Sequence, residues 1–254
     1  MPTVLILSSH VAADAVGGSA QVVAFARAGI ETIFAPTVLF GRHPGRGAPG
    51  GGAVEAAIFE GVLTGIAENG AFETLDAVVT GYFANANQVA VAVRTIDAVR
   101  AVNPGVRIVV DPIMGDYGTG LYVKAAVADA LAADMVSRAD LLAPNAWELA
   151  RLSGFAVDEP ASALAAIRGL GRPVLVSSVA AGAAIGVIYA DATQAWLATH
   201  RRADDVPHGT GDLLTALFTS AVVRGASPAD ALETAVSEIA RRFAEAPVNI
   251  ARLT

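Results

Sequence analysis

Short apolar runs alternate along this chain with longer segments in which apolar residues recur every three or four positions. Residues 4–8 form the first apolar run, and a turn with two glycines separates it from a helical segment at residues 19–28. A second apolar run follows at residues 30–36. A strand, a helix and a second strand in this order form a parallel pair with a crossover helix. The pattern therefore predicts an α/β fold.

The alternation continues through the middle of the chain and then changes. It predicts helices at residues 53–68, 85–102 and 123–136 and strands at residues 77–80, 106–110 and 140–143. Three later runs leave no room for helices between them, which predicts antiparallel strands at residues 173–178, 186–190 and 194–199. Two helices are expected to close the chain, at residues 212–224 and 228–246. We therefore expect one three-layer α/β/α domain over residues 1–254, with a mostly parallel central sheet and an antiparallel extension.

Residues 40–52 differ from the segments on either side. The stretch holds six glycines and two prolines, a composition that holds no regular element. It predicts either a flexible surface loop or a mobile flap beside a binding site, because long loops in compact domains are often functional. Its glycines do not join a strand directly to a helix, so a dinucleotide-binding phosphate loop is a poor fit.

Composition narrows the classes of function. Hydrophobic residues make up 54% of the 254 residues and charged residues 16%, which suits a sheet buried on both faces. The net charge of −7 argues against nucleic acid or an anionic membrane as the main partner. The longest strongly apolar helical segment, residues 213–223, is too short to cross a bilayer, so we expect a cytoplasmic protein.

Two residue types limit the chemistry further. Cysteine is absent, which excludes disulfides, thiolate nucleophiles and cysteine-based zinc sites. Lys124 is the only lysine and does not follow a glycine-rich turn, so the chain has no P-loop. Any nucleotide chemistry must therefore use the phosphate site of another fold.

A glycine-bracketed threonine precedes the first of the two closing helices, in the stretch Gly209-Thr210-Gly211-Asp212. Aspartate often caps helices and glycine often forms turns, so the stretch is consistent with an ordinary capped helix. The unpaired amides of a helix start also form an anion site. A carboxylate kept beside such a site indicates a base, which takes a proton from a hydroxyl while the amides stabilise a moving phosphoryl group.

Other polar residues follow the predicted strands, at the edge where ligands bind in a mostly parallel sheet. Asp111 and Asp116 lie in one turn, and Asn145 and Glu148 lie three residues apart at the start of a helix. A set of a few carboxylates and one amide suits Mg²⁺, which keeps waters and substrate phosphates as further ligands. Asn145 and Glu148 also match a capping box, and the two roles are compatible. Further polar residues expected at this edge are Ser9, Thr37, Tyr82 and Ser177.

Together these motifs resemble the pyridoxal kinases of the ribokinase-like superfamily, and the resemblance spans nearly the whole chain. The stretches that carry it are Ser8-Ser9-His10-Val11, Val16-Gly17-Gly18-Ser19-Ala20, Thr37-Val38-Leu39-Phe40 with His43, Thr80-Gly81-Tyr82, Asp111-Pro112-Ile113-Met114-Gly115-Asp116 and Ala143-Pro144-Asn145 with Glu148. Residues 209–212 resemble the anion-hole signature that many sugar and vitamin kinases share. The resemblance implies a ribokinase-like fold and ATP-dependent phosphorylation of the 5′-hydroxymethyl group of pyridoxal.

The resemblance also implies a role for each matching residue. Asp212 would deprotonate the substrate hydroxyl, and the amides of Gly209, Thr210, Gly211 and Asp212 would hold the transferring phosphoryl group. The implied substrate pocket comprises Ser9, Val16, Thr37, Phe40, His43 and Tyr82. The residues implied around ATP and Mg²⁺ are Asp111, Asp116, Tyr122, Asn145, Glu148 and Ser177, with Asp111 and Glu148 as metal ligands. A monovalent cation such as K⁺ and a homodimer are further expectations.

Three departures from the family pattern keep alternatives open. Pro44 replaces a threonine beside the substrate, Gly18 replaces an asparagine, and the segment at residues 178–208, where the family places its nucleotide lid, is short. One alternative is a kinase for hydroxymethylpyrimidine or another small alcohol, although the opening lacks the G-S-D-x-S-G-G-A-G pattern of the pyrimidine kinases. The other is a homologue that binds pyridoxal without catalysis, against which the retained Asp212 argues.

Overall fold

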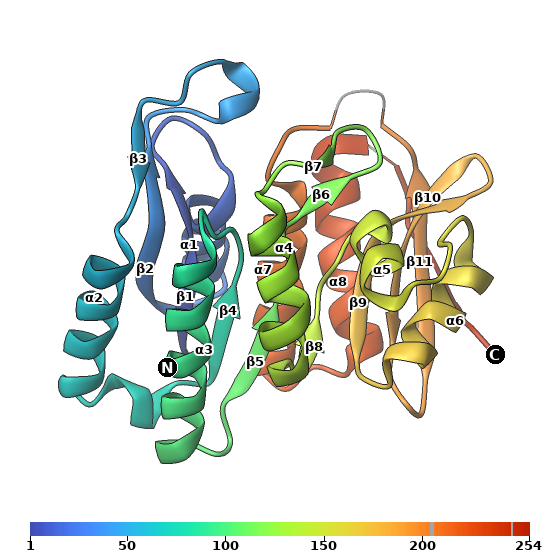
Figure 1. Ribbon diagram of the computed structural model, residues 1–254. Helices are drawn as coiled ribbons and strands as arrows, with labels where there is room; N and C mark the ends of the chain where they lie inside the picture. The colour runs from blue at the N-terminus through green and yellow to red at the C-terminus, as the bar shows by residue number, and fades with distance from the viewer. Residues whose placement is uncertain (204–205, 245) are drawn as a thin grey trace.

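Ten strands pair into one sheet in a computed structural model that describes residues 1–203, 206–244 and 246–254 (Figure 1). The strand order is β12-β11-β10-β9-β8-β5-β4-β1-β2-β3. Six neighbouring strands are parallel: β2 (Glu31–Phe40), β1 (Thr3–Val11), β4 (Ala77–Thr80), β5 (Arg107–Val110), β8 (Leu141–Leu142) and β9 (Val174–Ala181). The antiparallel strands are β10 (Ala184–Ala190), β11 (Ala195–Arg201) and β12 (Asn249–Arg252) at one edge and β3 (Gly51–Ala53) at the other.

Helices cover both faces of the sheet, as Figure 1 shows. One face carries α2 (Ala56–Glu68), α3 (Ala86–Val102), α4 (Ala125–Ala130), α5 (Ala146–Ser153) and α6 (Pro160–Leu170). The other carries α1 (Gly17–Arg27), α7 (Thr210–Val223) and α8 (Pro228–Ile239). Successive residues of β1 alternate between the two cores, with Leu5 and Leu7 on the first face and Val4 and Ile6 on the second. A strand buried on both faces needs an unbroken apolar run, as β1 has. The predicted three-layer α/β/α class is confirmed.

The strands and helices predicted from the sequence are present, with shifted ends. The elements that were not predicted include α6, β12, β3 and the small hairpin of β6 (Gly115–Asp116) and β7 (Gly120–Leu121). The prediction that residues 40–52 hold no regular element was wrong. A 3₁₀ turn forms at Pro44–Arg46, and β3 pairs with the end of β2. The open edge of β2 offers hydrogen-bonding groups that outweigh the poor strand propensity of glycine.

Two predicted helices end earlier than expected. The helix predicted over residues 123–136 is regular only through α4, then continues as a π turn at Leu131–Met135 and a 3₁₀ turn at Val136–Arg138. The helix predicted to reach residue 246 is regular through α8 and continues as a π turn at Ala240–Ala244. Residue 245 of that prediction lies outside the described residues. Apolar periodicity does not distinguish an α turn from a π turn, because both keep the same face buried.

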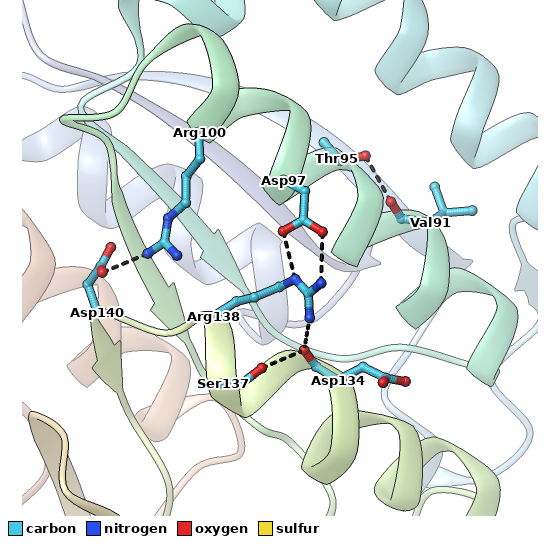
Figure 2. Close-up of polar contacts among 8 residues, drawn as sticks. All are labelled: Val91, Thr95, Asp97, Arg100, Asp134, Ser137, Arg138 and Asp140. Carbon is cyan, nitrogen blue, oxygen red and sulfur yellow. Dashed lines mark hydrogen bonds and ion pairs between the residues drawn. The ribbon is translucent and has the colours of Figure 1, made fainter.

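A polar network on the surface ties α3 to the segment before β8 (Figure 2). Arg138 donates two hydrogen bonds to Asp97, at 2.7 and 2.8 Å, and this bidentate contact lowers the pKa of the Asp97 carboxyl. Arg100 donates to Oδ1 of Asp140 at 2.6 Å, while Oδ2 of Asp140 accepts the N–H of Ile108 at 2.8 Å. Exposed ion pairs contribute little stability, and it is the hydrogen bond from Ile108 to Asp140 that joins the start of β8 to β5. The parallel pairing of β8 with β5 places the residues that follow both strands at the candidate site.

The described helices include none that is both long and apolar enough to span a membrane.

Candidate active site

The polar residues singled out in the sequence gather at the carboxyl ends of the parallel strands, opposite the start of α7. Hydrogen bonds or close contacts join segments that are far apart in the chain at this edge. Ser9 lies in β1, Asp111 follows β5, and Asn145 follows β8. These residues therefore lie at the sheet edge that the sequence predicts, although Ser9, Thr37 and Ser177 lie within strands rather than after them. These strands extend beyond their apolar runs because their neighbours still offer pairing partners.

Asp212 lies in the first turn of α7, where one of its carboxylate oxygens is held and the other is not. Its Oδ2 accepts the backbone N–H of Gly17 at 2.8 Å. Its Oδ1 is shielded from solvent and has no hydrogen-bond partner. Burial raises the pKa of this carboxyl to about 6, against the opposing effects of the backbone N–H groups of Gly17 and of Asp212 itself. A buried acceptor without a partner indicates that a ligand group supplies the missing hydrogen bond.

Glycine is required on both sides of this contact. Gly209 has a φ of +89°, and a Cβ there would lie 2.3 Å from the carbonyl oxygen of Ala15. Gly17 has a φ of +57°, and a Cβ there would lie 1.9 Å from Oγ of Ser9. No other residue adopts these conformations at such short distances without displacing its neighbours. The start of α7 and the loop before α1 therefore meet backbone to backbone, with Asp212 between them.

Asp111 is buried beside α7, with a relative exposure of 5%. Its Oδ2 accepts a hydrogen bond from the hydroxyl of Thr215 at 3.0 Å. Burial raises the pKa of Asp111 well above its ordinary value, and the nearby charges of Glu148 and Asp212 raise it further. Three carboxylates within electrostatic reach of one another repel in the absence of a cation. The cluster therefore favours a positively charged ligand.

Glu148 is the most constrained of these carboxylates. Its Oε1 accepts the N–H of Met114 at 2.7 Å, and its Oε2 accepts the N–H of Asn145 at 2.9 Å. Asn145 in turn accepts the N–H of Glu148 at 3.0 Å, so the predicted capping box is confirmed. The side chain of Asn145 also donates to the carbonyl of Gly115 at 2.8 Å. Burial raises the pKa of Glu148 to about 7, despite these N–H donors, which lower it.

The hairpin of β6 and β7 lies against this box. Asp116 accepts the N–H groups of Gly118 and Thr119 at 2.8 and 2.7 Å, so its carboxylate shapes the hairpin turn. Burial raises the pKa of Tyr122, and the nearby charges of Glu148, Asp111, Asp116 and Asp212 raise it further. The phenol therefore stays neutral and is able to donate a hydrogen bond.

Ser177 joins the phosphate side of the site through β9. It forms a parallel bridge with Asn145, and its N–H donates to the carbonyl of Pro144 at 3.0 Å. The next residue, Ser178, has a φ of +61°, which serine seldom adopts. The structure thus brings together all six residues that the sequence placed around a nucleotide: Asp111, Asp116, Tyr122, Asn145, Glu148 and Ser177.

On the other side, Thr37 supports the pocket rather than facing a ligand with its hydroxyl. The pairing of β1 with β2 skips Thr37, because Ser8 pairs with Pro36 and Ser9 with Val38. A residue bulged out of the ladder next to a proline turns its side chain away from the regular direction. The Thr37 hydroxyl donates to the carbonyl of Tyr82 at 2.6 Å. The N–H of Tyr82 donates to the Ser8 hydroxyl at 3.3 Å, so Tyr82 is fixed by both strands.

The remaining predicted substrate residues lie at the end of β2 and at the starts of α1 and the 3₁₀ turn. Val16 is the N-cap of α1 and lies directly against Gly209. Phe40 ends β2 and is half-buried. His43 caps the 3₁₀ turn that begins at Pro44, where a missing N–H costs nothing. The Pro44 departure from the family pattern therefore has a local structural role.

Sequence reasoning missed some residues that the structure brings to the site. Thr215 follows Asp212 by three residues and so lies on the same helix face, a signal that was available. Gly17 lies within one of the family-like motifs, but nothing in the sequence indicates that its N–H donates to Asp212. His208 and Asp14 were also missed, because their contacts depend on the tertiary fold.

The oxygen donors at this site match what Mg²⁺ requires. Among residues 1–203, 206–244 and 246–254, no three or more His, Asp or Glu side chains are arranged to hold a metal. Mg²⁺ does not need such a cage, since it is commonly held by one or two carboxylates together with waters and phosphates. Asp111 provides a buried carboxylate, and the oxygens of Glu148 keep lone pairs for waters around a cation. The residues present therefore fit a Mg²⁺ ion that arrives with a phosphate ligand.

The fold and this site define a small-molecule kinase of the ribokinase-like class. Comparison with known proteins then gives the family. The family described as phosphomethylpyrimidine kinase matches residues 52–251. The pyridoxine/pyridoxal/pyridoxamine kinase of Bordetella avium is 36% identical over 252 residues, covering 96% of this chain and 83% of that protein. Pyridoxal kinase PdxY of Corynebacterium diphtheriae is 34% identical, covering 93% and 86%.

Solved structures agree with these relatives. The pyridoxal kinase of Entamoeba histolytica superimposes with a TM-score of 0.89 at 26% identity, covering 95% of this chain and 88% of that one. The pyridoxal kinase of Leishmania donovani, solved in complex with ADP and pyridoxamine, has the same fold with a TM-score of 0.89 at 24% identity, covering 95% and 85%. The chain therefore belongs to the pyridoxal kinase family.

Proposed function

We propose that this protein transfers the γ-phosphoryl group of ATP to the 5′-hydroxymethyl group of pyridoxal, giving pyridoxal 5′-phosphate. The observation that carries the proposal is the position of Asp212. Its Oδ1 has no partner, its Oδ2 accepts the N–H of Gly17 in the loop expected to hold the vitamin, and its charge reaches Asp111, which is expected to organise ATP. The names of the two bacterial relatives, both B6-vitamer kinases, support the choice of substrate.

The proposed mechanism uses positioning and charge rather than a covalent intermediate. Oδ1 of Asp212 accepts the proton of the substrate hydroxyl, while the Gly17 N–H holds Oδ2 and so fixes the direction of the acceptor. The first amides of α7, at Thr210, Gly211 and Asp212, point to the place where the transferring phosphoryl group would lie. A pKa of about 6 leaves Asp212 ionised at neutral pH and more basic than an exposed aspartate.

Asp111, with Glu148 acting through waters, would hold Mg²⁺ against the ATP phosphates. When bound, the ion supplies charge neutralisation for the phosphates and relieves the repulsion within the carboxylate cluster. Asn145 holds the β6–β7 hairpin by its bond to Gly115, and the neutral Tyr122 phenol is available to a phosphate oxygen. We also propose that a monovalent cation such as K⁺ activates the enzyme, which a titration of K⁺ in the kinase assay would test.

The deciding experiment is an ATP-dependent assay for pyridoxal 5′-phosphate with the wild type and the variants Asp212→Ala and Asp212→Asn. Both variants should lose about 10²- to 10⁴-fold in kcat, the range for a general base, while ATP binding measured by calorimetry stays unchanged. Equal activity in the wild type and the variants would remove Asp212 as the base. Pyridoxine and pyridoxamine belong in the same substrate panel, because the Bordetella avium relative is named for all three.

A second candidate function follows from the description of the matching family as phosphomethylpyrimidine kinase. In this alternative the acceptor would be the hydroxymethyl group of a pyrimidine, and Asp212 would keep its role. Turnover of hydroxymethylpyrimidine without turnover of pyridoxal would favour it. Binding of pyridoxal without any turnover would instead indicate a non-catalytic homologue.

We further propose that residues 1–254 work as one kinase domain, as a homodimer and in the cytoplasm, where ATP is available. The continuous ten-stranded sheet supports the single domain. Analytical ultracentrifugation of the full chain would test the dimer.

A further inference from the structure

Two histidines from distant parts of the chain stack face to face beside the start of α7. The ring centroids of His43 and His208 lie 4.1 Å apart, with 24° between the ring planes. His43 follows β2, in the glycine-rich segment above that strand (Figure 1), and His208 directly precedes Gly209. The stack therefore joins the proposed substrate side to the turn that would hold the phosphoryl group.

The segment around His43 is also fastened from a second direction, by Asp14 in the loop between β1 and α1. Oδ2 of Asp14 accepts the backbone N–H of His43 at 2.7 Å, and Oδ1 lies 3.2 Å from Nε of Arg46. The Asp14 side chain is only 8% exposed. On the ring, Nδ1 of His43 accepts the N–H of Gly45 at 3.1 Å, which leaves the proton of a neutral imidazole on Nε2. The ring is thus oriented before any ligand binds.

Little space remains between Gly45 and the stacked rings. A Cβ on Gly45 would lie 3.0 Å from Nδ1 of His43 and 3.2 Å from Nε2 of His208. Gly45 does not have a positive φ, so alanine there changes the space and not the backbone preference. A Cβ on Gly52, in the same segment, would contact nothing within 4 Å. Gly45→Ala is therefore a wedge against the stack, and Gly52→Ala is its matched control.

We propose that His208 is a positioning residue for the transfer reaction: by stacking on His43 it holds the substrate-side segment in register with the start of α7. The inference rests on the proposed function, because it assigns His43 to the substrate pocket. Without the stack, the segment would keep its Asp14 contacts but lose its link to α7. The substrate would then be held less firmly, while the phosphoryl-transfer turn would be unchanged.

The charges around the stack give it a pH dependence. His43 faces His208, Asp14 and Arg46. Burial and the charge of His208 lower the pKa of His43, Asp14 raises it, and Arg46 lowers it. Protonating both imidazoles would place two positive charges in contact, a repulsion that Asp14 offsets only in part. Acidic conditions should therefore weaken the stack.

Steady-state kinetics with pyridoxal and ATP test the consequence. In His208→Ala the KM for pyridoxal should rise about three- to ten-fold, the range expected from one aromatic stack. The kcat and the KM for ATP should change less than about twofold, since the start of α7 is intact. His208→Phe should restore the KM and remove its rise at acidic pH. Gly45→Ala should behave like His208→Ala, and Gly52→Ala like the wild type.

Hydrogen exchange of the full chain tests the contact itself without any activity. His208→Ala should speed amide exchange in residues 41–52 and leave exchange in β2 unchanged. An unchanged exchange rate in that segment, or a pyridoxal KM within about twofold of wild type, overturns the inference. A wild type that does not phosphorylate pyridoxal contradicts the proposed function instead. In that case the exchange result alone decides whether His208 holds the segment.

Discussion

The N–H of Gly17 and Oδ2 of Asp212 form a 2.8 Å hydrogen bond between residues separated by 195 positions in the chain. The bond occupies one carboxylate oxygen and leaves the other, Oδ1, buried without a hydrogen-bond partner. Gly17 itself packs on Ser9, which the family resemblance places against the substrate ring. The orientation of the proposed base is therefore set by the loop expected to hold the substrate, not by α7 alone.

The activity should depend on pH through the ionisation of Asp212. Burial raises the pKa of Asp212 to about 6, and the base acts only when ionised. The kcat/KM for pyridoxal should therefore be level from about pH 7 to 8 and fall about tenfold per unit below pH 6. The measurement is a pH–rate profile corrected for the ionisation of pyridoxal. A descending limb that begins near pH 4, as for an exposed aspartate, would contradict the assignment. The His208→Phe variant should keep this limb, which separates it from the histidine stack.

A pair of glycine substitutions should separate folding from ligand binding at the start of α7. Gly209→Ala places a Cβ against the Ala15 carbonyl at a φ of +89°, so unfolding in urea should show a loss of about 1–3 kcal/mol. Gly211 has no neighbour within 4 Å of its Cβ position, so Gly211→Ala should keep or slightly raise the free energy of unfolding. Its kcat should still fall, because the new methyl group stands where the phosphoryl group would lie. A fully active Gly211→Ala would argue that the phosphoryl group lies elsewhere.

Thr37 should act through Tyr82 and not by contacting the substrate. Thr37→Val removes the hydroxyl that donates to the Tyr82 carbonyl at 2.6 Å, at a site with no solvent exposure. A loss of about 1 kcal/mol in the free energy of unfolding is expected, with a higher KM for pyridoxal. Thr37→Ser keeps the donor and is the control, and it should bind pyridoxal as the wild type does. If Thr37→Ser weakened binding as much as Thr37→Val, the methyl group rather than the hydroxyl would be the important part.

The layers of the fold and the edge that carries the site could be predicted, because both follow from patterns local to the sequence. Apolar runs such as residues 106–110 have strand character, and a capping box such as Asn145 with Glu148 has a fixed spacing. The role of Thr37 could not be predicted in this way. Its side-chain direction depends on a register skip between β1 and β2, and a skip is a property of the pairing rather than of either strand.

The contacts of residues 40–52 were beyond sequence reasoning for a related reason. The glycines and prolines correctly indicate a weak local preference for regular secondary structure. A weak local preference does not exclude contacts with residues elsewhere in the chain. The segment is ordered by Asp14, by His208 and by the edge of β2. Each of these partners is distant from the segment in the sequence, and no motif indicates that it contacts residues 40–52. Interactions of this kind become predictable only when the three-dimensional arrangement is known.

The last prediction is that Asp111 costs stability in the absence of a cation. Burial raises its pKa well above the usual value, and the charges of Glu148 and Asp212 raise it further. A carboxyl whose folded pKa is raised contributes stability that is full below its unfolded pKa and is lost as the pH rises through the folded pKa. The melting temperature of the cation-free protein should therefore fall from pH 5 to pH 8. Asp111→Asn keeps an acceptor for the Thr215 hydroxyl and should flatten this fall.

Thermal melts of both proteins at pH 5 and pH 8, in EDTA, provide the measurement. The Asp111→Asn variant should melt above the wild type at pH 8, by about 2–4 °C for each kcal/mol of relieved repulsion. Its kinase activity should fall about 10- to 100-fold, because the same carboxylate is proposed to hold Mg²⁺. Asp129→Asn makes an equal charge change on the exposed surface and should alter neither property. If Asp111→Asn melted in parallel with the wild type at both pH values, the carboxylate cluster would not be under electrostatic strain. A stabilised but inactive variant would instead show that the protein keeps this repulsion for the cation it binds.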